Sequence, residues 1–292
     1  KIIPFFQKNL YSLPTNRGLH NYSKPTGGGI IFVLIFVISS LINKVYLPLL
    51  SLPLAFMGLI DDKFNIPGKQ KYIYQLITVF LIIIYTTNFN NNYLSQILKD
   101  NTYVYIILLF VGTAIINIIN FMDGIDGLIA GTSLIIFSSI FYNNFFYIIP
   151  LICSLLVFLY FNWNPSRMFM GDSGSLFIGS YLLSLIYTSQ NFNGSFKIIL
   201  LCLPLLIDSS ICILRRLINR QNIFQPHKLH LYQRLVSNGL KHSTVSSIYI
   251  ITIFILGLLY CFSNLISMVI CNGVIVIFGF YLNKKFALKF SN

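Results

Sequence analysis

The sequence predicts an all-α polytopic membrane protein, with about ten transmembrane helices in one domain that covers residues 1–292. Hydrophobic residues form 56% of the 292-residue chain, charged residues form only 9%, and the mean hydropathy is +0.77. These values are typical of an integral membrane protein and exclude a soluble domain with a large core. The apolar residues also gather into long runs, and each run must be helical because a bilayer offers its backbone polar groups no water.

Ten such runs follow a polar N-terminal segment that is rich in Gly and Pro. We expect spans at residues 28–43, 45–60, 72–88, 102–120, 127–142, 145–161, 173–189, 197–214, 244–262 and 265–283. Several of these runs are at the short limit for crossing a bilayer. No repeat or low-complexity linker separates them, so we assign them to one domain. Residues 1–6 look like the tail of a further apolar segment, so we expect eleven spans in the full-length protein and see no signal peptide.

The basic residues assign the two sides of the membrane. With ten spans both termini lie on one side, and that side holds 17 of the 20 Lys and Arg residues. Because basic residues accumulate on the cytoplasmic side, we predict that this side is cytoplasmic. Its main loops are residues 61–71, 121–126, 162–172 and 215–243.

The acidic residues point to the same face. All seven acids are Asp, and the topology places five of them there together with all four His. An acid costs about 2.5–3.5 kcal/mol at the centre of a bilayer and less toward its surface. A chain with so few acids does not need them beside its spans for solubility, so we interpret them as residues that take part in the chemistry of an active site. The sequence therefore predicts an active site on the cytoplasmic face.

The net charge of +13 reflects this scarcity of acids. The basic residues lie between apolar runs rather than on one soluble face, so we do not expect nucleic acid as a partner. Membrane lipids with anionic headgroups and phosphorylated substrates fit better. The five Cys all lie inside apolar runs without metal-ligand spacing, and we interpret them as small buried hydrophobic residues.

Asp61 and Asp62 follow the second apolar run. Adjacent acids point about 100° apart on a helix, so both can reach one site only from a helix end or a loop. Paired carboxylates near a membrane surface suit Mg²⁺ together with a general base. As an alternative they could cap the helix expected near Tyr72, but they lie too far upstream of it.

A second motif contains Asn117, Asn120, Asp123 and Asp126. The first three recur at i, i+3 and i+6 on one helix face, which Asp126 would share with Asp123. A polar stripe that enters a span usually lines a cavity. The alternative is that Asp126 caps the next helix, which would leave the other three unexplained.

A third cluster, residues 161–175, includes Asn162, Phe169 and Asp172. Asp172 precedes a helix that is expected to start at Ser173, where the positive helix end can favour a bound phosphate. The alternative is simple N-capping by Asp172.

The loop 215–243 holds His227, His230 and four Arg, including Arg234. Two His at i and i+3 could bind a metal, but the four Arg favour a cationic clamp for a diphosphate. Ordinary positive-inside charge is the alternative. Asp208 lies seven residues before Arg215 on the same helix face, and we expect a structural ion pair between them.

With these clusters in place, the chain resembles the polyprenyl-phosphate N-acetylhexosamine-1-phosphate transferases, also classed as glycosyltransferase family 4. That family includes the bacterial enzymes that start O-antigen and related glycans and the phospho-MurNAc-pentapeptide translocase. The similarity rests on five motifs in order: Asn16-Arg17…His20…Pro25-Thr26-Gly-Gly-Gly, Asp61-Asp62, Asn117…Asn120…Asp123-Gly-Ile-Asp126-Gly-Leu, Met170-Gly-Asp172-Ser-Gly-Ser, and the histidine loop that ends at Arg234.

One of these motifs departs from the usual family pattern, and another indicates the branch of the family. The usual Pro-Thr-Pro-Arg-Gly-Gly-Gly is shortened here to Pro25-Thr26-Gly-Gly-Gly, so the phosphate contact of the missing Arg is in question. The stretch from His227 to Arg234 is similar to the O-antigen-initiating branch rather than to the triple-His loop of the translocase.

The resemblance implies catalytic roles for Asp61, Asp62, Asp126 and His227 and a metal-binding role for Asp172. Asp172 would be the main Mg²⁺ ligand, and Asp61 would deprotonate the lipid phosphate while Asp62 helps to place the metal or that phosphate. Asp126 would face the metal and the diphosphate, which His227 would help to clamp. The other matching residues would bind substrate. Asn120, Asp123 and Asn162 would hold the nucleotide, and Phe169 would stack on the uracil ring. Lys69 would lie near the nucleotide, and His230 and Arg234 would clamp the diphosphate or the sugar.

The implied reaction is the Mg²⁺-dependent transfer of an N-acetylhexosamine 1-phosphate from a UDP-sugar to undecaprenyl phosphate, with Mn²⁺ as a substitute metal. It would release UMP and start O-antigen or another cell-envelope polysaccharide, in a multi-pass protein of the inner (cytoplasmic) membrane. Homodimers occur in this family, but the sequence alone does not give the oligomeric state. One alternative is the translocase of peptidoglycan synthesis, against which the histidine loop argues. Another is an ion-coupled transporter, which would have mid-membrane acids and an inverted repeat; only Asp208 is deep, and we find no repeat.

Overall fold

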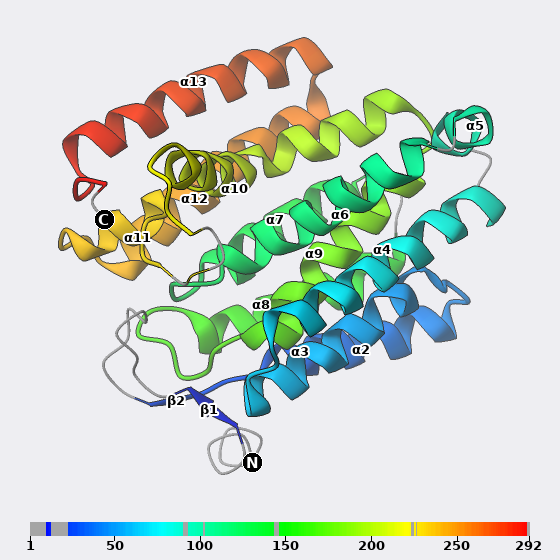
Figure 1. Cartoon of the computed structure of the whole chain (residues 1–292), viewed down its shortest axis with the longest axis horizontal. Coiled ribbons are helices and arrows are strands. Elements are labelled where there is room, and N and C mark those ends of the chain that lie inside the picture. The colour runs from blue at the N-terminus through cyan, green and yellow to red at the C-terminus, as the bar shows by residue number, and fades with distance from the viewer. Residues whose placement is uncertain are drawn as a thin grey trace.

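The computed structural model describes residues 10–12, 23–89, 93–101, 103–142, 146–222, 225 and 227–290. Every apolar run contains one long helix, and these helices lie side by side as a bundle (Figure 1). Their bounds are α2 Gly29–Ile42, α3 Leu52–Phe64, α4 Gly68–Phe89, α6 Tyr103–Phe121, α7 Leu128–Phe141, α8 Ile149–Asn162, α9 Gly171–Thr188, α10 Phe192–Ile218, α12 His242–Phe262 and α13 Leu265–Lys285. Short 3₁₀ helices, η1 Leu47–Ser51 and η2 Phe146–Ile148, lead into α3 and α8.

Two further helices and two strands lie outside the apolar runs. Helix α5, Tyr93–Asp100, buries Leu94 and Leu98 on one face, and helix α11, Leu231–Ser237, lies within the histidine loop. The strands β1, Tyr11–Ser12, and β2, Lys24–Pro25, pair antiparallel. The described chain is thus all-α apart from this two-residue pairing, which places the Lys24–Pro25 strand at one end of the bundle.

Within the described part of the chain, four helices are long and apolar enough to cross a membrane: α6, α10, α12 and α13. Helices α2 and α7 and the segment Phe146–Asn162 are apolar but shorter. Large hydrophobic side chains such as Ile106, Ile251 and Ile277 are strongly exposed on these helices, which suits contact with lipid. The number of spans and the side of the membrane stay predictions.

Helix α9 forms the centre of the bundle. Every residue from Ser173 to Tyr187 is buried, because α2, α3, α4, α6 and α10 surround it. Glycines allow this close packing: a Cβ atom at Gly29 would lie 2.4 Å from the Cα of Gly174, and one at Gly58 would lie 2.5 Å from the carbonyl carbon of Asp172. Small residues at helix contacts are typical of membrane proteins, where they let backbones approach closely.

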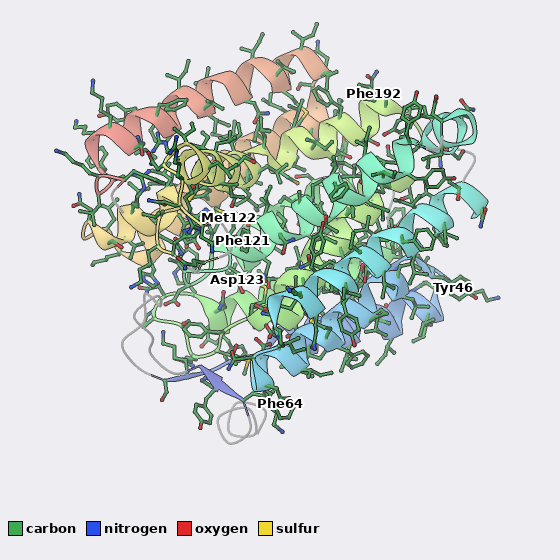
Figure 2. The ribbon with its side chains drawn as sticks, in the orientation of Figure 1. Tyr46, Phe64, Phe121, Met122, Asp123 and Phe192 are labelled. Carbon is green, nitrogen blue, oxygen red and sulfur yellow. The ribbon has the colours of Figure 1, made fainter. Side chains whose placement is uncertain are left out.

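The bundle has two distinct ends. Figure 2 places Asp123 and Phe64 near one end and Tyr46 and Phe192 near the other. The end with Asp123 also carries β1, β2 and α11, whereas α5 lies at the opposite end (Figure 1). The motif residues therefore gather at one end of the molecule, as the predicted topology requires.

Candidate active site

Asp61 and Asp62 lie in the last turn of α3, and they point to different partners. Asp62 accepts hydrogen bonds at the start of α9, from the backbone N of Asp172 at 2.9 Å and of Ser173 at 3.4 Å. A carboxylate is favoured there because the first backbone N–H groups of a helix lack partners within the helix. The alternative that these acids cap the helix after them is wrong, since Asp62 binds the N-terminus of α9 instead.

Asp61 is buried and accepts a 2.6 Å hydrogen bond from the backbone N of Ile66. The Lys71 ammonium forms an ion pair with Asp61 and also lies 3.3 Å from Oδ2 of Asp172. Lys71 thus connects two carboxylates that come from α3 and α9. Lys69, the lysine chosen from the motif, is exposed at the start of α4.

The carboxylates at this point influence one another's protonation. Burial raises the pKa of Asp172 to about 7, and its hydrogen bond with Asp61 acts in the same direction. Burial also raises the pKa of Asp61, but contacts with Asp172 and Lys71 outweigh it and leave that pKa below its usual value. Burial and the charge of Asp172 raise the pKa of Asp62 and of Asp123 well above the usual range. It is therefore unfavourable for all four acids to be charged at once with Lys71 as the cation beside them.

This donor set fits a small divalent cation. Mg²⁺ binds through one or two carboxylates and keeps several waters, and a cation would relieve the repulsion that raises these pKa values. Asp172 is central, because it lies against both Asp62 and Lys71.

The polar residues of α6 fall into two groups. Asn117 exchanges two hydrogen bonds with Gln75 of α4, at 2.8 and 2.9 Å, so it joins two helices. Asn120 accepts a 2.5 Å hydrogen bond from Ser175 of α9. Asp123 is partly buried after α6, and no side-chain hydrogen bond or ion pair to it is found within the described part of the chain. Asp123 is therefore the residue of this motif whose carboxylate is most available to a ligand.

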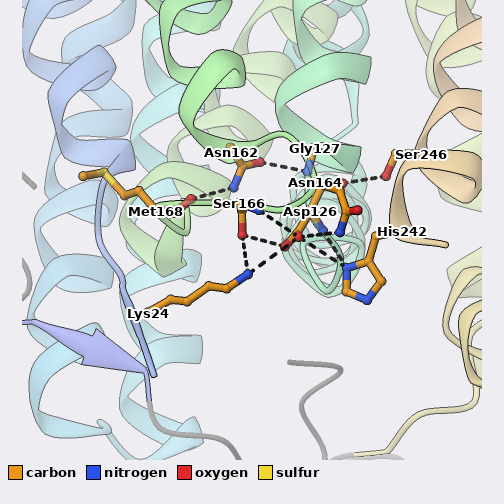
Figure 3. Close-up of polar contacts among 9 residues, drawn as sticks. All are labelled: Lys24, Asp126, Gly127, Asn162, Asn164, Ser166, Met168, His242 and Ser246. Atoms are coloured by element: carbon orange, nitrogen blue, oxygen red, sulfur yellow. Dashed lines mark hydrogen bonds and ion pairs between the residues drawn. The ribbon is translucent and has the colours of Figure 1, made fainter. Parts of the chain in front are cut away.

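Asp126 lies at the centre of a polar network that Figure 3 shows. Its side chain is only 3% exposed and accepts hydrogen bonds from Nδ2 of Asn164 at 3.0 Å and from the N and Oγ of Ser166 at 3.2 and 2.8 Å. Lys24 and His242 each lie 3.7 Å from its Oδ2. Burial raises the pKa of Asp126, but the contacts with His242, Ser166, Asn164 and Lys24 outweigh it and hold that pKa well below its usual range.

Through these contacts Asp126 connects three segments: β2, the loop after α8, and the start of α12 (Figure 3). It does not cap α7, which begins at Leu128 with Gly127 before it. Asn162 also connects the loop after α8 with the residue that follows Asp126. Its Oδ1 accepts a hydrogen bond from the backbone N of Gly127 at 3.0 Å, and its Nδ2 donates one to the backbone O of Met168 at 2.9 Å. The role of Asp126 toward a metal and that of Asn162 toward a nucleotide stay predictions.

Phe169 is half-buried beside this network. Its backbone N donates to the O of Pro25 at 2.8 Å, and the Lys24 ammonium lies 5.1 Å from the centre of its ring. Lys24 therefore connects Phe169 with Asp126. Neither Lys24 nor His242 was predicted as a site residue from the sequence, because both lie far along the chain from Asp126.

The histidine loop packs against the end of α6. The rings of His227 and His230 are stacked with their centres 5.0 Å apart, and Tyr232 donates a 2.8 Å hydrogen bond to the O of Phe121. A Cβ at Gly124 would lie 2.1 Å from the Tyr232 hydroxyl oxygen, so this loop also contacts the Asp123 motif. Burial lowers the pKa of both His to about 4, with nearby Arg216 acting in the same direction. Both imidazoles are therefore neutral near pH 7.

Arg234 and Asp208 hold this loop in place. The Arg234 side chain is 5% exposed and donates to the O of Leu229 at 3.1 Å and of Leu288 at 2.7 Å. Asp208 accepts from the N of Leu231 at 2.7 Å and the hydroxyl of Tyr249 at 2.6 Å.

The expected ion pair between Asp208 and Arg215 is not found in the described part of the chain, because α11 and Tyr249 satisfy the carboxylate instead. Cys212, His227 and His230 form a compact group, with one donor atom from each within 4.8 Å of the others. Arg17 and His20 of the first motif lie outside the described residues.

A family model for "Glycosyl transferase family 4" matches residues 44–190, which is half of the chain and includes the Asp61, Asp123 and Asp172 motifs. The chain belongs to this family of transferases.

Three curated relatives make the similarity more specific. The chain is 29% identical over 276 residues to a "Probable undecaprenyl-phosphate N-acetylglucosaminyl 1-phosphate transferase" of Bacillus subtilis (strain 168), covering 87% of this chain and 76% of the relative. It is 30% identical to a "Decaprenyl-phosphate N-acetylglucosaminephosphotransferase" of Mycobacterium leprae (strain TN), over 65% of this chain and 56% of the relative. It is 34% identical to a "Phospho-N-acetylmuramoyl-pentapeptide-transferase" of Dictyoglomus turgidum (strain DSM 6724 / Z-1310), over 55% and 58%. The matched length is therefore under three fifths of the last two relatives.

Proposed function

We propose that this protein transfers an N-acetylhexosamine 1-phosphate from a UDP-sugar to a polyprenyl phosphate, undecaprenyl phosphate in a bacterium. The carboxylate cluster of Asp61, Asp62 and Asp172, bridged by Lys71 at one end of an apolar helix bundle, carries this proposal. A lipid acceptor requires a site that opens to the bilayer, and a charged nucleotide requires a site that faces water. A cluster of acids at the end of lipid-exposed helices meets both conditions.

In the proposed reaction, an oxygen of the lipid phosphate attacks the sugar-bearing β-phosphorus of the UDP-sugar. The bond from that phosphorus to the oxygen bridging the two phosphates breaks, its electron pair stays on that oxygen, and UMP leaves. A phosphate monoester has a second pKa near 6, so the acceptor is largely ionised at neutral pH and requires little help from a base. Positioning and electrostatics should therefore dominate the catalysis, as in phosphoryl transfer generally.

A bound Mg²⁺, or Mn²⁺ in its place, would cancel charge between the two phosphates as they approach. Asp172 and Asp62 are the residues that would hold it, and Lys71 would keep the Asp61 carboxylate oriented beside them. Asp61 has a pKa below its usual value, which suits a charged positioning group better than a strong base.

The remaining motif residues fit substrate-binding roles. Asp123 has an available carboxylate near the metal region, and Phe169 has a half-buried ring that could stack on a base next to Lys24. The neutral His227 and His230 would donate hydrogen bonds, while the arginines of the loop supply its positive charge. Arg234 would support this loop rather than touch the substrate, since protein acceptors already engage its guanidinium.

We further propose that the site faces the cytoplasm of a multi-pass inner-membrane protein with about ten spans, which acts as a homodimer. Its product would start O-antigen or another cell-envelope polysaccharide. The similarity to the Dictyoglomus protein keeps a second candidate, transfer of phospho-N-acetylmuramoyl-pentapeptide, under consideration. Membership of a transferase family argues against an ion-coupled transporter.

Release of UMP by purified protein, undecaprenyl phosphate, UDP-N-acetylglucosamine and Mg²⁺ tests this proposal. Asp61→Asn and Asp172→Asn should each remain folded with little turnover, whereas Lys63→Gln, at an exposed position beside Asp62, should behave like the wild type. Near-normal, Mg²⁺-dependent UMP release by either Asp variant would remove that residue from the mechanism. A wild type that accepts only UDP-N-acetylmuramoyl-pentapeptide would favour the second candidate.

A further inference from the structure

A cavity lies between α10, α12 and α13, away from the carboxylate cluster. Aliphatic and aromatic side chains line most of it, among them Leu203, Ile211, Ile248, Ile275 and Phe278. Helix α13 packs on α10 and α12 at the opposite side of the bundle from α2 and α3 (Figure 1), so this space is separate from the carboxylate cluster, although it adjoins the residues that hold the histidine loop.

The cavity extends along α13 from Asn283, near the end of that helix, to Asn272. These two residues are eleven positions apart, which corresponds to about 16 Å at 1.5 Å per residue. Half of the hydrocarbon core of a bilayer is about 15 Å thick. The cavity is therefore about as deep as one leaflet of a membrane.

The inner part of the cavity is shaped by two features of the sequence. Pro204 lies inside α10 and has no N–H, so the carbonyl of Leu200 loses its usual helical partner. Asn272 of α13 replaces that partner, because its Nδ2 donates to the O of Leu200 at 3.2 Å. Gly279 of α13 lines the cavity, and a Cβ atom there would have no neighbour within 4 Å. A side chain at this position would therefore extend into open space.

The end of the cavity at Asn283 is positively charged. Arg215 and Arg234 both line it, and their guanidinium groups lie 5.7 and 5.6 Å from the ring of Phe290. Arg215 is half-buried and donates one hydrogen bond, to Oδ1 of Asn283 at 3.3 Å, which leaves further donors for an anion. Asp208 also lines the cavity, but Tyr249 and the start of α11 engage its carboxylate.

We propose that this cavity binds one acyl chain of an anionic glycerophospholipid, whose phosphate pairs with Arg215. The depth fits a chain from one leaflet, the walls fit hydrocarbon, and the cationic end fits a phosphate at the membrane surface. The lipid would fill the space between α13 and the α10–α12 pair, and so stabilise the helices that hold the histidine loop. A polyprenyl phosphate acceptor is disfavoured here, because its phosphate would have to reach the carboxylate cluster on α3 and α9.

Native mass spectrometry of the detergent-purified protein, titrated with phosphatidylglycerol or phosphatidylcholine, tests this proposal. Wild-type protein should retain one phosphatidylglycerol at concentrations where it retains no phosphatidylcholine. Gly279→Leu, which fills the cavity, should weaken that binding at least tenfold, whereas Gly273→Leu should not, since Gly273 also has open space around it but does not line the cavity. Arg215→Gln should weaken binding similarly, and Lys285→Gln, an exposed change at the same end of α13, should not.

Several results would overturn the proposal. Equal binding of the two phospholipids would remove the role of charge, and unchanged binding by both Gly279→Leu and Arg215→Gln would place the lipid elsewhere. If Gly279→Leu does not fold, Arg215→Gln alone decides between these outcomes. One-for-one displacement of phosphatidylglycerol by undecaprenyl phosphate, lost in Gly279→Leu, would assign the cavity to the acceptor lipid instead.

Discussion

The contact between α3 and α9 at Gly58 sets the spacing of the carboxylates, and Gly58→Ala tests this directly. A Cβ atom at position 58 would lie 2.5 Å from both the carbonyl carbon and the oxygen of Asp172. Ordinary contact begins at 3.4 Å, so the two backbones would have to move apart by about 0.9 Å. The hydrogen bond from the N of Asp172 to Oδ1 of Asp62, now 2.9 Å, would lengthen to about 3.8 Å and be lost.

The expected cost appears in catalysis more than in folding. A misplacement of about 1 Å can reduce turnover on the order of 100-fold, whereas an extra methyl group in a packed contact costs about 1–3 kcal/mol of stability. We therefore expect Gly58→Ala to fold, with a lowered unfolding temperature and a kcat for UMP release about 100-fold below the wild type.

The assay compares kcat and thermal unfolding for Gly58→Ala and for Gly273→Ala in detergent. Gly273 lies on α13, where an added Cβ meets nothing within 4 Å, so this control should match the wild type in both measurements. A kcat for Gly58→Ala within about threefold of the wild type would refute the argument that this contact positions the acids.

Three further predictions concern Lys71, Asn162 and His230. Lys71→Gln should lower kcat about tenfold or more, because Asp61 and Asp172 lose the cation they share, and a larger loss in Lys69→Gln would contradict this assignment. Asn162→Ala should lower the free energy of unfolding by at least about 2 kcal/mol, since two buried backbone groups lose their partner; an unchanged denaturant midpoint would refute it. His230 has a folded pKa of about 4, so the unfolded chain binds its proton first and stability should fall as the pH drops from about 6.5 toward 4. His230→Gln should flatten that pH dependence of the unfolding midpoint, and an unaltered slope would contradict the reasoning.

The long helices could be predicted from the sequence because apolar composition and backbone pairing fix them together. The ends of the helices were harder to predict. Helix α4 begins at Gly68 rather than at residue 72, because Lys69 and Lys71 continue the helix outside its apolar run. Helix α5 was missed because only Leu94 and Leu98 mark its buried face, which is too short a pattern to stand out from a polar loop.

The sequence indicated which motifs hold the candidate site residues, but it could not indicate the contacts of those residues. Spacing could not choose between Lys69 and Lys71, because the choice depends on the rotation of α4 relative to α9. The partners of Asp126 could not be foreseen either, since Lys24 and His242 come from segments far apart in the chain. The same limit explains the wrong partner predicted for Asp208. Its distance along the sequence suggested an ion pair with Arg215, but in the fold its carboxylate binds the start of α11.

The central claim is that the carboxylate cluster transfers a sugar phosphate to a lipid phosphate. The most direct test is to incubate purified protein with undecaprenyl phosphate, Mg²⁺ and a panel of UDP-aminosugars, and to follow UMP and the lipid product by mass spectrometry. We predict UMP together with one undecaprenyl-diphospho-sugar for the wild type, and neither product for Asp172→Asn at unchanged unfolding temperature. No product with any donor, or equal product from Asp172→Asn, would contradict the claim.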